Sequence, residues 1–321
     1  YGDDAAAKKP MFAKQIMERN QHNVSIYFNH PSVVTWSLGN ETVMGDNFLQ
    51  AYKWVKSQDQ SRPVQYEQAR QGEGTDIFCP MYYSVKNCEN YCKNPNSKMP
   101  LIQCEYNHTM GNSGGNLKEY WDLVRKYPIF QGGFDWDFVD QGIRDKSPIT
   151  GKEIFTYGGD YGRYPASDYN FNCNGIISPD RRLNPHAYEV QYYLQNVWIK
   201  DLDAANGTFN VYNEHFFKNI DDLKLTAAVY ANGVLLSTVE IPGTKGIAPQ
   251  TTKLVKSDAL QEAVAKAEAE HAREEITVNF AFASDGSEPL VDKGQVMARQ
   301  QFVINGYEFD LSLIHISEPT R

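Results

Sequence analysis

Residues 30–41 read His-Pro-Ser-Val-Val-Thr-Trp-Ser-Leu-Gly-Asn-Glu. The part from Ser32 to Leu38 is rich in apolar and β-branched residues and lies between a proline and a glycine. This pattern predicts a strand that is buried on both faces, as in parallel sheets and barrels. Asn40 and Glu41 follow at the carboxyl end of that strand, the edge where α/β barrels carry their chemistry. On this stretch alone, Glu41 is open to a second interpretation as a solvated surface carboxylate.

A second stretch has the same construction. Residues 101–105 read Leu-Ile-Gln-Cys-Glu, an apolar run that ends in a carboxylate. A pair of carboxyl groups, here at two neighbouring strand ends, is the smallest set of side chains that cleaves a glycosidic bond. One of them, with a raised pKa, protonates the leaving oxygen, and the other attacks the anomeric carbon or activates water. Glu41 and Glu105 are therefore the candidate catalytic pair.

Strand and helix patterns alternate around these two stretches. Short apolar runs predict strands, and apolar residues at helical spacing predict helices. The expected strands are 64–66, 76–79 and 129–136, and the expected helices are 46–56 and 117–127. The Asn-, Lys- and Pro-rich residues 86–100 predict a loop. Such alternation predicts a parallel sheet or barrel with right-handed crossovers.

From residue 201 onward the pattern changes to alternation with period two, which is typical of half-buried strands. It is seen at 208–212, 223–230 and 275–282, and Ala231-Asn-Gly-Val is typical of a hairpin turn. The Ala-, Glu- and Lys-rich residues 258–273 predict a helix between two of these strands. We therefore expect an all-β domain, an immunoglobulin-like sandwich, and we find no catalytic pattern in it.

The overall composition excludes several classes of protein. A length of 321 residues allows two domains of ordinary size. The net charge of −9, without a basic patch, argues against a nucleic-acid partner. No apolar run approaches the roughly 20 residues that a membrane-spanning helix needs. The compartment stays open between the cytoplasm, which we favour, and the periplasm or the exterior.

The cysteines do not form a recognisable framework. Their number is five, and no Cys-x-x-Cys pair is present, which argues against a disulfide scaffold or a zinc site. Cys88 and Cys92 fall in the expected loop and could pair with each other in an oxidising compartment.

Several of these stretches resemble one known family. The two carboxylate stretches (30–41 and 104–113), residues 131–141, and Asn174-Gly-Ile-Ile resemble the signatures of the large bacterial β-galactosidases, in family 2 of the glycoside hydrolases. The resemblance implies that residues 1–200 are the later strands of a partial (β/α)8 TIM barrel and that 201–310 are the sandwich domain. Residues 311–321 look like the translated end of a sequencing adapter, so we expect them not to be native.

The resemblance also implies roles for the site residues. Glu41 is similar to the family's general acid/base, and Asn40 beside it to the residue that hydrogen-bonds the sugar 2-hydroxyl. Glu105 is similar to the nucleophile of a retaining double displacement. His108 would donate to sugar hydroxyls, with a structural histidine as the alternative.

Two aromatic residues complete the implied site. Tyr82 matches the tyrosine that hydrogen-bonds the nucleophile, and Tyr83 is the alternative if the register is shifted by one. Trp136 matches the aromatic floor beneath the apolar face of the galactosyl ring. As a lone tryptophan in a strand, it would instead be assigned to the core.

The family resemblance implies two metal ions as cofactors, Mg²⁺ and Na⁺. Glu41 matches one magnesium ligand, and the other protein ligands of that ion come from a segment upstream of Tyr1 in the family. The carbonyl of Phe171 and the side chain of Asn174 match sodium ligands. Oxygen ligands suit both of these hard cations.

These observations predict a retaining hydrolase that removes terminal β-D-galactosyl residues from lactose-type substrates. The alternatives are another family 2 activity, β-glucuronidase or β-mannosidase, and a carbohydrate-binding barrel without turnover. The stretch around Trp136 and the pair Phe171 and Asn174 favour galactose. We expect the longer parent protein to be a homo-oligomer and this chain alone to be inactive.

Overall fold

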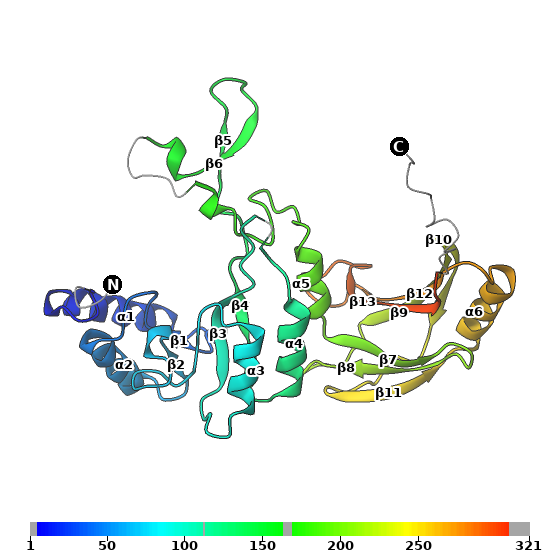
Figure 1. The fold of residues 1–321 in the computed structure, drawn as a ribbon, viewed down its shortest axis with the longest axis horizontal. Coiled ribbons are helices and arrows are strands. Elements are labelled where there is room, and N and C mark those ends of the chain that lie inside the picture. The colour runs from blue at the N-terminus through cyan, green and yellow to red at the C-terminus, as the bar shows by residue number, and fades with distance from the viewer. Residues whose placement is uncertain (1–4, 112, 163–168, 308–321) are drawn as a thin grey trace, which may run out of the picture. The chain divides into compact units, whose positions relative to one another are not determined.

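The computed structural model describes residues 5–111, 113–162 and 169–307 (Figure 1). The chain divides into two compact units, Tyr1–Tyr193 and Leu194–Arg321. The division falls before the expected boundary at 200/201, because strand β7 (Val197–Asp203) pairs with β8 (Thr208–Asn213) of the second unit. The expected adapter residues 311–321 lie outside the described residues.

The first unit begins with two helices that cover a short parallel strand pair. They are α1 (Ala13–Tyr27), which follows the 3₁₀ turn η2 (Pro10–Phe12), and α2 (Asp46–Gln58). The pair is β1 (Trp36–Ser37) and β2 (Val64–Gln65), with the turn η3 (Glu67–Ala69) after it. The core between them contains Trp36, Leu38, Phe48, Val55 and Tyr66. The expected helix 46–56 is thus present in α2.

The expectation of a strand at 32–38 buried on both faces is wrong in two respects. Only Trp36 and Ser37 have strand pairing, and the buried positions alternate along the run. Trp36 and Leu38 pack against residues of α1 and α2, whereas Val34 is 70% exposed. Among the described residues, helices cover one face of this run and β2 is its one paired neighbour, so the other face keeps its solvent contact.

A second parallel pair follows in the first unit. It consists of β3 (Leu101–Tyr106) and β4 (Phe130–Asp135), connected through α4 (Leu117–Lys126). Single parallel bridges from Phe78 to Leu101 and from Met81 to Glu105 extend this pairing. The segment expected as the strand 76–79 therefore lies beside β3, where the N–H groups of Ile102 and Cys104 donate to the carbonyls of Phe78 and Pro80, but it forms isolated bridges and not a continuous strand.

Residues 86–100 are not the single loop that their composition predicts. Helix α3 (Val85–Lys93) occupies the first part, and the Ser84 side chain caps it by accepting from the Asn87 amide. Cys88 and Tyr91, three residues apart, are its buried positions. This spacing lets a polar segment bury one face, which composition alone does not reveal. The thiols of Cys88 and Cys92 are free, so the proposed pairing is not formed.

The rest of the first unit contains elements without a predicted counterpart. A hairpin leads away from the strand ends, and short helical segments precede the second unit (Figure 1). These elements are β5 (Ile143–Lys146), β6 (Glu153–Thr156), η4 (Gly158–Asp160), η5 (Tyr169–Asn172) and α5 (Ala187–Tyr193).

The second unit is the expected β-sandwich. One sheet has the order β11-β8-β7, the other β10-β9-β12-β13, and all of their pairings are antiparallel. The further strands are β9 (Leu223–Ala231), β10 (Val234–Ile241), β11 (Thr251–Lys256), β12 (Ile276–Ser284) and β13 (Val296–Asn305). Helix α6 (Asp258–Glu270) confirms the expected helix, and Ser257 caps it.

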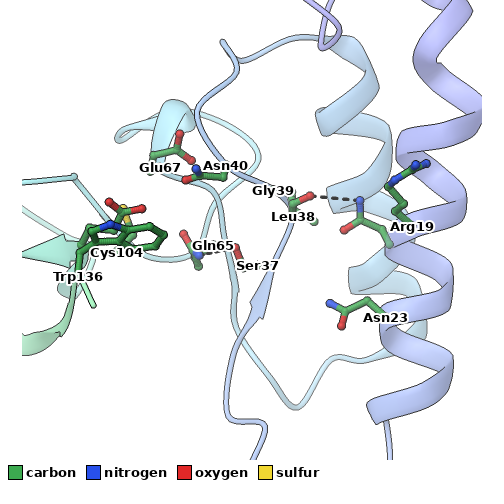
Figure 2. Close-up of a pocket in the computed structure, with 12 residues that line it drawn as sticks. Arg19, Asn23, Ser37, Leu38, Gly39, Asn40, Gln65, Glu67, Cys104 and Trp136 are labelled. Atoms are coloured by element: carbon green, nitrogen blue, oxygen red, sulfur yellow. Dashed lines mark hydrogen bonds between the residues drawn. The ribbon is translucent and has the colours of Figure 1, made fainter. Parts of the chain in front are cut away.

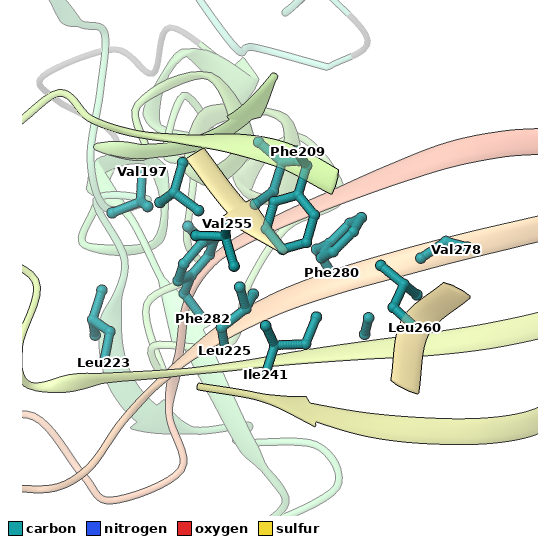
Figure 3. Close-up of a cluster of buried hydrophobic side chains, with 14 of the residues drawn as sticks. Val197, Phe209, Leu223, Leu225, Ile241, Val255, Leu260, Val278, Phe280 and Phe282 are labelled. Atoms are coloured by element: carbon teal, nitrogen blue, oxygen red, sulfur yellow. The ribbon is translucent and has the colours of Figure 1, made fainter. Parts of the chain in front are cut away.

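The core of the second unit comes from the inner faces of both sheets (Figure 3). Phe209 of one sheet and Phe280 of the other have ring centroids 5.0 Å apart. The β9–β10 hairpin turns at Asn232 and Gly233, both with positive φ (45° and 77°). Such angles suit the two-residue turns that match strand twist.

Within the residues the structure describes, no helix is long and apolar enough to span a bilayer.

We expect Ile199→Val to destabilise the second unit by about 0.5–1.5 kcal/mol, the usual result of removing one buried methylene. Ile199 on β7 is 1% exposed and lies in the sandwich core. The matched control is Leu254→Val on β11, which also removes one methylene but at a side chain that is 67% exposed. Urea unfolding followed by circular dichroism measures both changes. An equal loss of stability in the two variants would contradict the assignment of this core.

Candidate active site

The first unit contains a cavity of about 520 Å³ at the carboxyl ends of its parallel strands (Figure 2). Its lining includes Asn40 after β1, Glu67 after β2, Glu105 near the end of β3 and Trp136 after β4. Parallel strands bring the residues that follow them to one edge, as in α/β barrels. The structure thus brings together Asn40, Glu105 and Trp136, which are far apart in the sequence.

Glu105 has a specific hydrogen-bond partner at this edge. The Tyr82 hydroxyl donates to Glu105 Oε2 at 2.6 Å, and the Tyr82 amide donates to the Glu105 carbonyl at 2.8 Å. Burial raises the pKa of the Glu105 carboxyl, the Tyr82 hydrogen bond lowers it, and the charge of Glu41 raises it again. For Tyr82, burial and the hydrogen bond to Glu105 both raise the pKa.

The neighbouring tyrosine occupies a different environment. The Tyr83 amide donates to Gln103 Oε1 at 2.6 Å, and its ring packs edge-on against Phe78 at 5.7 Å. It belongs to a hydrophobic cluster under α3 and α4. Of the two tyrosines that the sequence left open, Tyr82 is the one that reaches Glu105.

Glu41 lies in a turn directly after the first strand. Its backbone has a φ of 46°, in the left-handed region that side chains other than glycine seldom adopt. Its amide donates to Glu67 Oε1 at 2.8 Å. The charge of Glu41 raises the pKa values of both Glu105 and Tyr82. It therefore acts electrostatically on the same carboxylate that Tyr82 contacts.

His108 joins the site through ring contacts. Its ring lies 5.4 Å from that of Tyr82, edge-on, and 5.9 Å from that of Phe171. The Met110 amide donates to His108 Nδ1 at 3.4 Å. The positive charge of His108, when protonated, lowers the pKa of Glu105. His108 is therefore close to the nucleophile candidate and not part of a remote core.

The expected sodium ligands also lie together. The Asn174 side-chain nitrogen donates to the Phe171 carbonyl, while Asn174 Oδ1 is buried and has no hydrogen-bond partner among the described residues. The oxygen and nitrogen of an amide are assigned from such networks. With the amide turned over, two oxygens would lie side by side, an arrangement that a hard cation stabilises. These residues therefore fit Na⁺.

This chain offers fewer of the expected ligands for Mg²⁺ than for Na⁺. Glu41 is the one expected ligand present, and the described residues contain no group of three or more His, Cys, Asp or Glu side chains that could hold a metal ion. By themselves these residues do not fit a magnesium site, and we assign no chemical step to that ion.

Glu67 is a buried carboxylate of the cavity lining that was not predicted from the sequence. The residue is 7% exposed and lines the cavity. The signal was present, because Val64-Gln-Tyr-Glu67 is a third short strand followed by a carboxylate. Burial raises the pKa of Glu67, and the hydrogen bond from the Glu41 amide opposes that rise.

Comparison with known proteins gives two family matches and a set of relatives. Residues 3–199 match the model of glycosyl hydrolases family 2, TIM barrel domain, and residues 209–305 match that of beta-galactosidase, domain 4. A Leuconostoc mesenteroides beta-galactosidase is 34% identical over 96% of this chain and 30% of its own length. Those of Aeromonas hydrophila and Photobacterium profundum are 38% and 36% identical, over 78% and 92% of this chain. The chain spans 25% and 29% of their lengths, so it corresponds to less than a third of these relatives.

Proposed function

The chain belongs to family 2 of the glycosyl hydrolases, and from that premise we propose that it is the catalytic part of a longer, retaining β-galactosidase. Its substrate is a terminal β-D-galactosyl group on a lactose-type sugar. The observation that carries the proposal is the position of the Glu105 carboxylate. It accepts a hydrogen bond from the Tyr82 hydroxyl and lines a cavity together with Asn40 and Trp136.

The reaction follows from two carboxyl groups in different roles. Glu105 attacks the anomeric carbon while the Glu41 carboxyl gives its proton to the departing glycosidic oxygen. Glu41, now a carboxylate, then takes a proton from water as that water releases galactose from Glu105. The two inversions leave the anomeric configuration retained.

The pKa of Glu105 is raised above its usual value, chiefly by burial, and two contacts limit that rise. Burial and the charge of Glu41 raise the pKa of Glu105, and the Tyr82 hydrogen bond and His108 lower it. A hydrogen bond to the charged form favours ionisation. The Tyr82 hydrogen bond therefore favours the ionised carboxylate, the form that attacks the anomeric carbon, at a position where burial opposes ionisation.

The sugar contacts come from two residues that line the cavity and from His108, which lies against Tyr82. Asn40 would hydrogen-bond the 2-hydroxyl, Trp136 would support the apolar face of the ring, and His108 would donate to sugar hydroxyls. The Phe171 carbonyl and Asn174 would hold Na⁺, which supplies a positive charge for a sugar hydroxyl. We also propose a homo-oligomeric parent, which light scattering on the purified protein would test.

The experiment compares nitrophenyl β-galactoside, β-glucuronide and β-mannoside as substrates of the full-length protein. We expect the galactoside to give the highest kcat/KM and nuclear magnetic resonance to show β-galactose as the first product. Preference for another glycone would replace the substrate assignment and keep the mechanism. A first product of α configuration would contradict the mechanism itself, and binding without turnover would favour a carbohydrate-binding barrel.

Tyr82→Phe tests the assignment of the hydrogen-bond donor. Losing the bond removes a cause that lowers the pKa of Glu105, whereas burial and Glu41 still raise it. The pKa therefore rises, and the acid limb of the pH profile of kcat/KM moves to higher pH. We expect kcat to fall about tenfold or more, as when a hydrogen bond to a charged group is lost.

The matched control for this variant is Tyr83→Phe, which removes a hydroxyl from the adjacent residue. The Tyr83 contacts with Gln103 and Tyr120 run through its backbone. Its pH profile should stay that of the unmodified enzyme. An acid limb that moves in Tyr83→Phe and not in Tyr82→Phe would reverse the assignment.

A further inference from the structure

Glu67 is a buried carboxylate at the cavity for which the proposed reaction has no direct use. Its side chain is 7% exposed, and Oε1 accepts the backbone N–H of Glu41 at 2.8 Å. Burial, followed by the charge of Glu67, raises the pKa of the Cys104 thiol to about 12. Glu67 therefore lies close to the segments that carry both catalytic carboxylates.

The turn that carries Glu41 needs outside support. With a φ of 46°, its backbone is in a region that costs free energy for a residue with a side chain. Two residues earlier, a Cβ on Gly39 would lie 2.8 Å from the Phe48 ring, so the chain passes close to α2. Conformations of this kind persist when surrounding contacts hold them.

Two adjacent side chains supply that support. The Glu67 carboxylate receives the N–H of Glu41, and the Tyr66 hydroxyl donates to the carbonyl of Thr42. Tyr66 is itself fixed, because its ring stacks on Phe48 at a centroid distance of 4.3 Å and an interplanar angle of 5°. The turn is thus held at the amide of one residue and the carbonyl of the next.

We propose that Tyr66 and Glu67 form a positioning clamp that orients Glu41 as the general acid. The clamp rests on the proposed function, since it acts only through the proton that Glu41 donates. A general acid must lie within hydrogen-bond reach of the leaving oxygen, and small displacements lower its contribution steeply. In this proposal Glu67 acts through the backbone N–H of Glu41, so it is a positioning residue.

The test measures how strongly the rate depends on the leaving group in the full-length enzyme. A dinitrophenyl aglycone leaves without protonation, whereas glucose leaving from lactose needs the proton from Glu41. We expect Glu67→Ala to lower kcat/KM for lactose about tenfold more than for dinitrophenyl β-galactoside. Glu67→Gln still offers an oxygen to the Glu41 amide, so its ratio should stay within about threefold of the unmodified enzyme.

A further variant and a control separate positioning from general damage. Glu67→Asp keeps the charge but is one methylene shorter, so it should resemble Glu67→Ala and replaces it if alanine prevents folding. Asp59 is also buried, at 4% exposure, and bonds to Trp36 away from the Glu41 turn. Asp59→Asn should lower Tm and leave the lactose-to-dinitrophenyl ratio unchanged.

Distinct outcomes overturn the clamp and the proposed function. Equal losses on both substrates in Glu67→Ala, or the same change of ratio in Asp59→Asn, would overturn the clamp while the galactosidase assignment stands. If the unmodified enzyme prefers another glycone, the same ratio is measured with that sugar and tests the clamp there. If it cleaves no glycoside, the proposed function and the clamp are both overturned.

Discussion

Glu105→Gln in the full-length protein is expected to lower kcat by roughly 10⁴–10⁶-fold on every substrate, the range for removal of a covalent nucleophile. Glutamine keeps the shape of the residue and can still accept the hydrogen bond that Tyr82 donates at 2.6 Å. It lacks the negative charge that attacks the anomeric carbon. Because no glycosyl-enzyme forms, the loss should not depend on how good the leaving group is.

Two measurements make this prediction specific. A 2-deoxy-2-fluoro galactoside with a good leaving group should label the unmodified enzyme, and mass spectrometry should place the label on Glu105. Glu119→Gln, the same change on the exposed surface of α4, is the matched control and should retain full activity. A label on another residue, or residual activity above about a hundredth of the unmodified rate, would refute the role of Glu105.

The sequence locates residues of the cavity lining, such as Asn40 and Glu105, more closely than it predicts the extent of the strands before them. A run such as 101–105 identifies both a strand and the carboxylate near its end, because the position of a residue along a strand depends on chain order alone. The extent of pairing depends on neighbours that local pattern does not contain. Accordingly β3 forms over Leu101–Tyr106, whereas β1 is limited to Trp36–Ser37.

The same distinction explains what was missed. Helix α3 was hidden by its polar composition, because only Cys88 and Tyr91 are buried in it. Glu67 follows the strand expected at 64–66, but the local sequence does not show that this carboxylate is buried. Its importance comes from a hydrogen bond to residue 41, which lies 26 residues away in the chain. Contacts of that range follow from the fold and not from local sequence.

Glu41→Gln is expected to lower kcat/KM by an amount that depends on the leaving group of the substrate. The amide cannot give a proton, so kcat/KM for lactose should fall by roughly 10²–10⁴-fold, the usual contribution of general acid catalysis. For dinitrophenyl β-galactoside the same parameter should change little, because that aglycone departs without a proton. This pattern differs from that of Glu105→Gln, in which both substrates lose activity together.

Added azide gives an independent measurement on the same variant. Hydrolysis of the galactosyl-enzyme needs Glu41 as a base, so in Glu41→Gln the intermediate should accumulate and kcat on the dinitrophenyl substrate should fall. Azide attacks without a base and should restore kcat, forming β-galactosyl azide. Equal losses on both substrates, with no rescue by azide, would assign the acid/base role to another group.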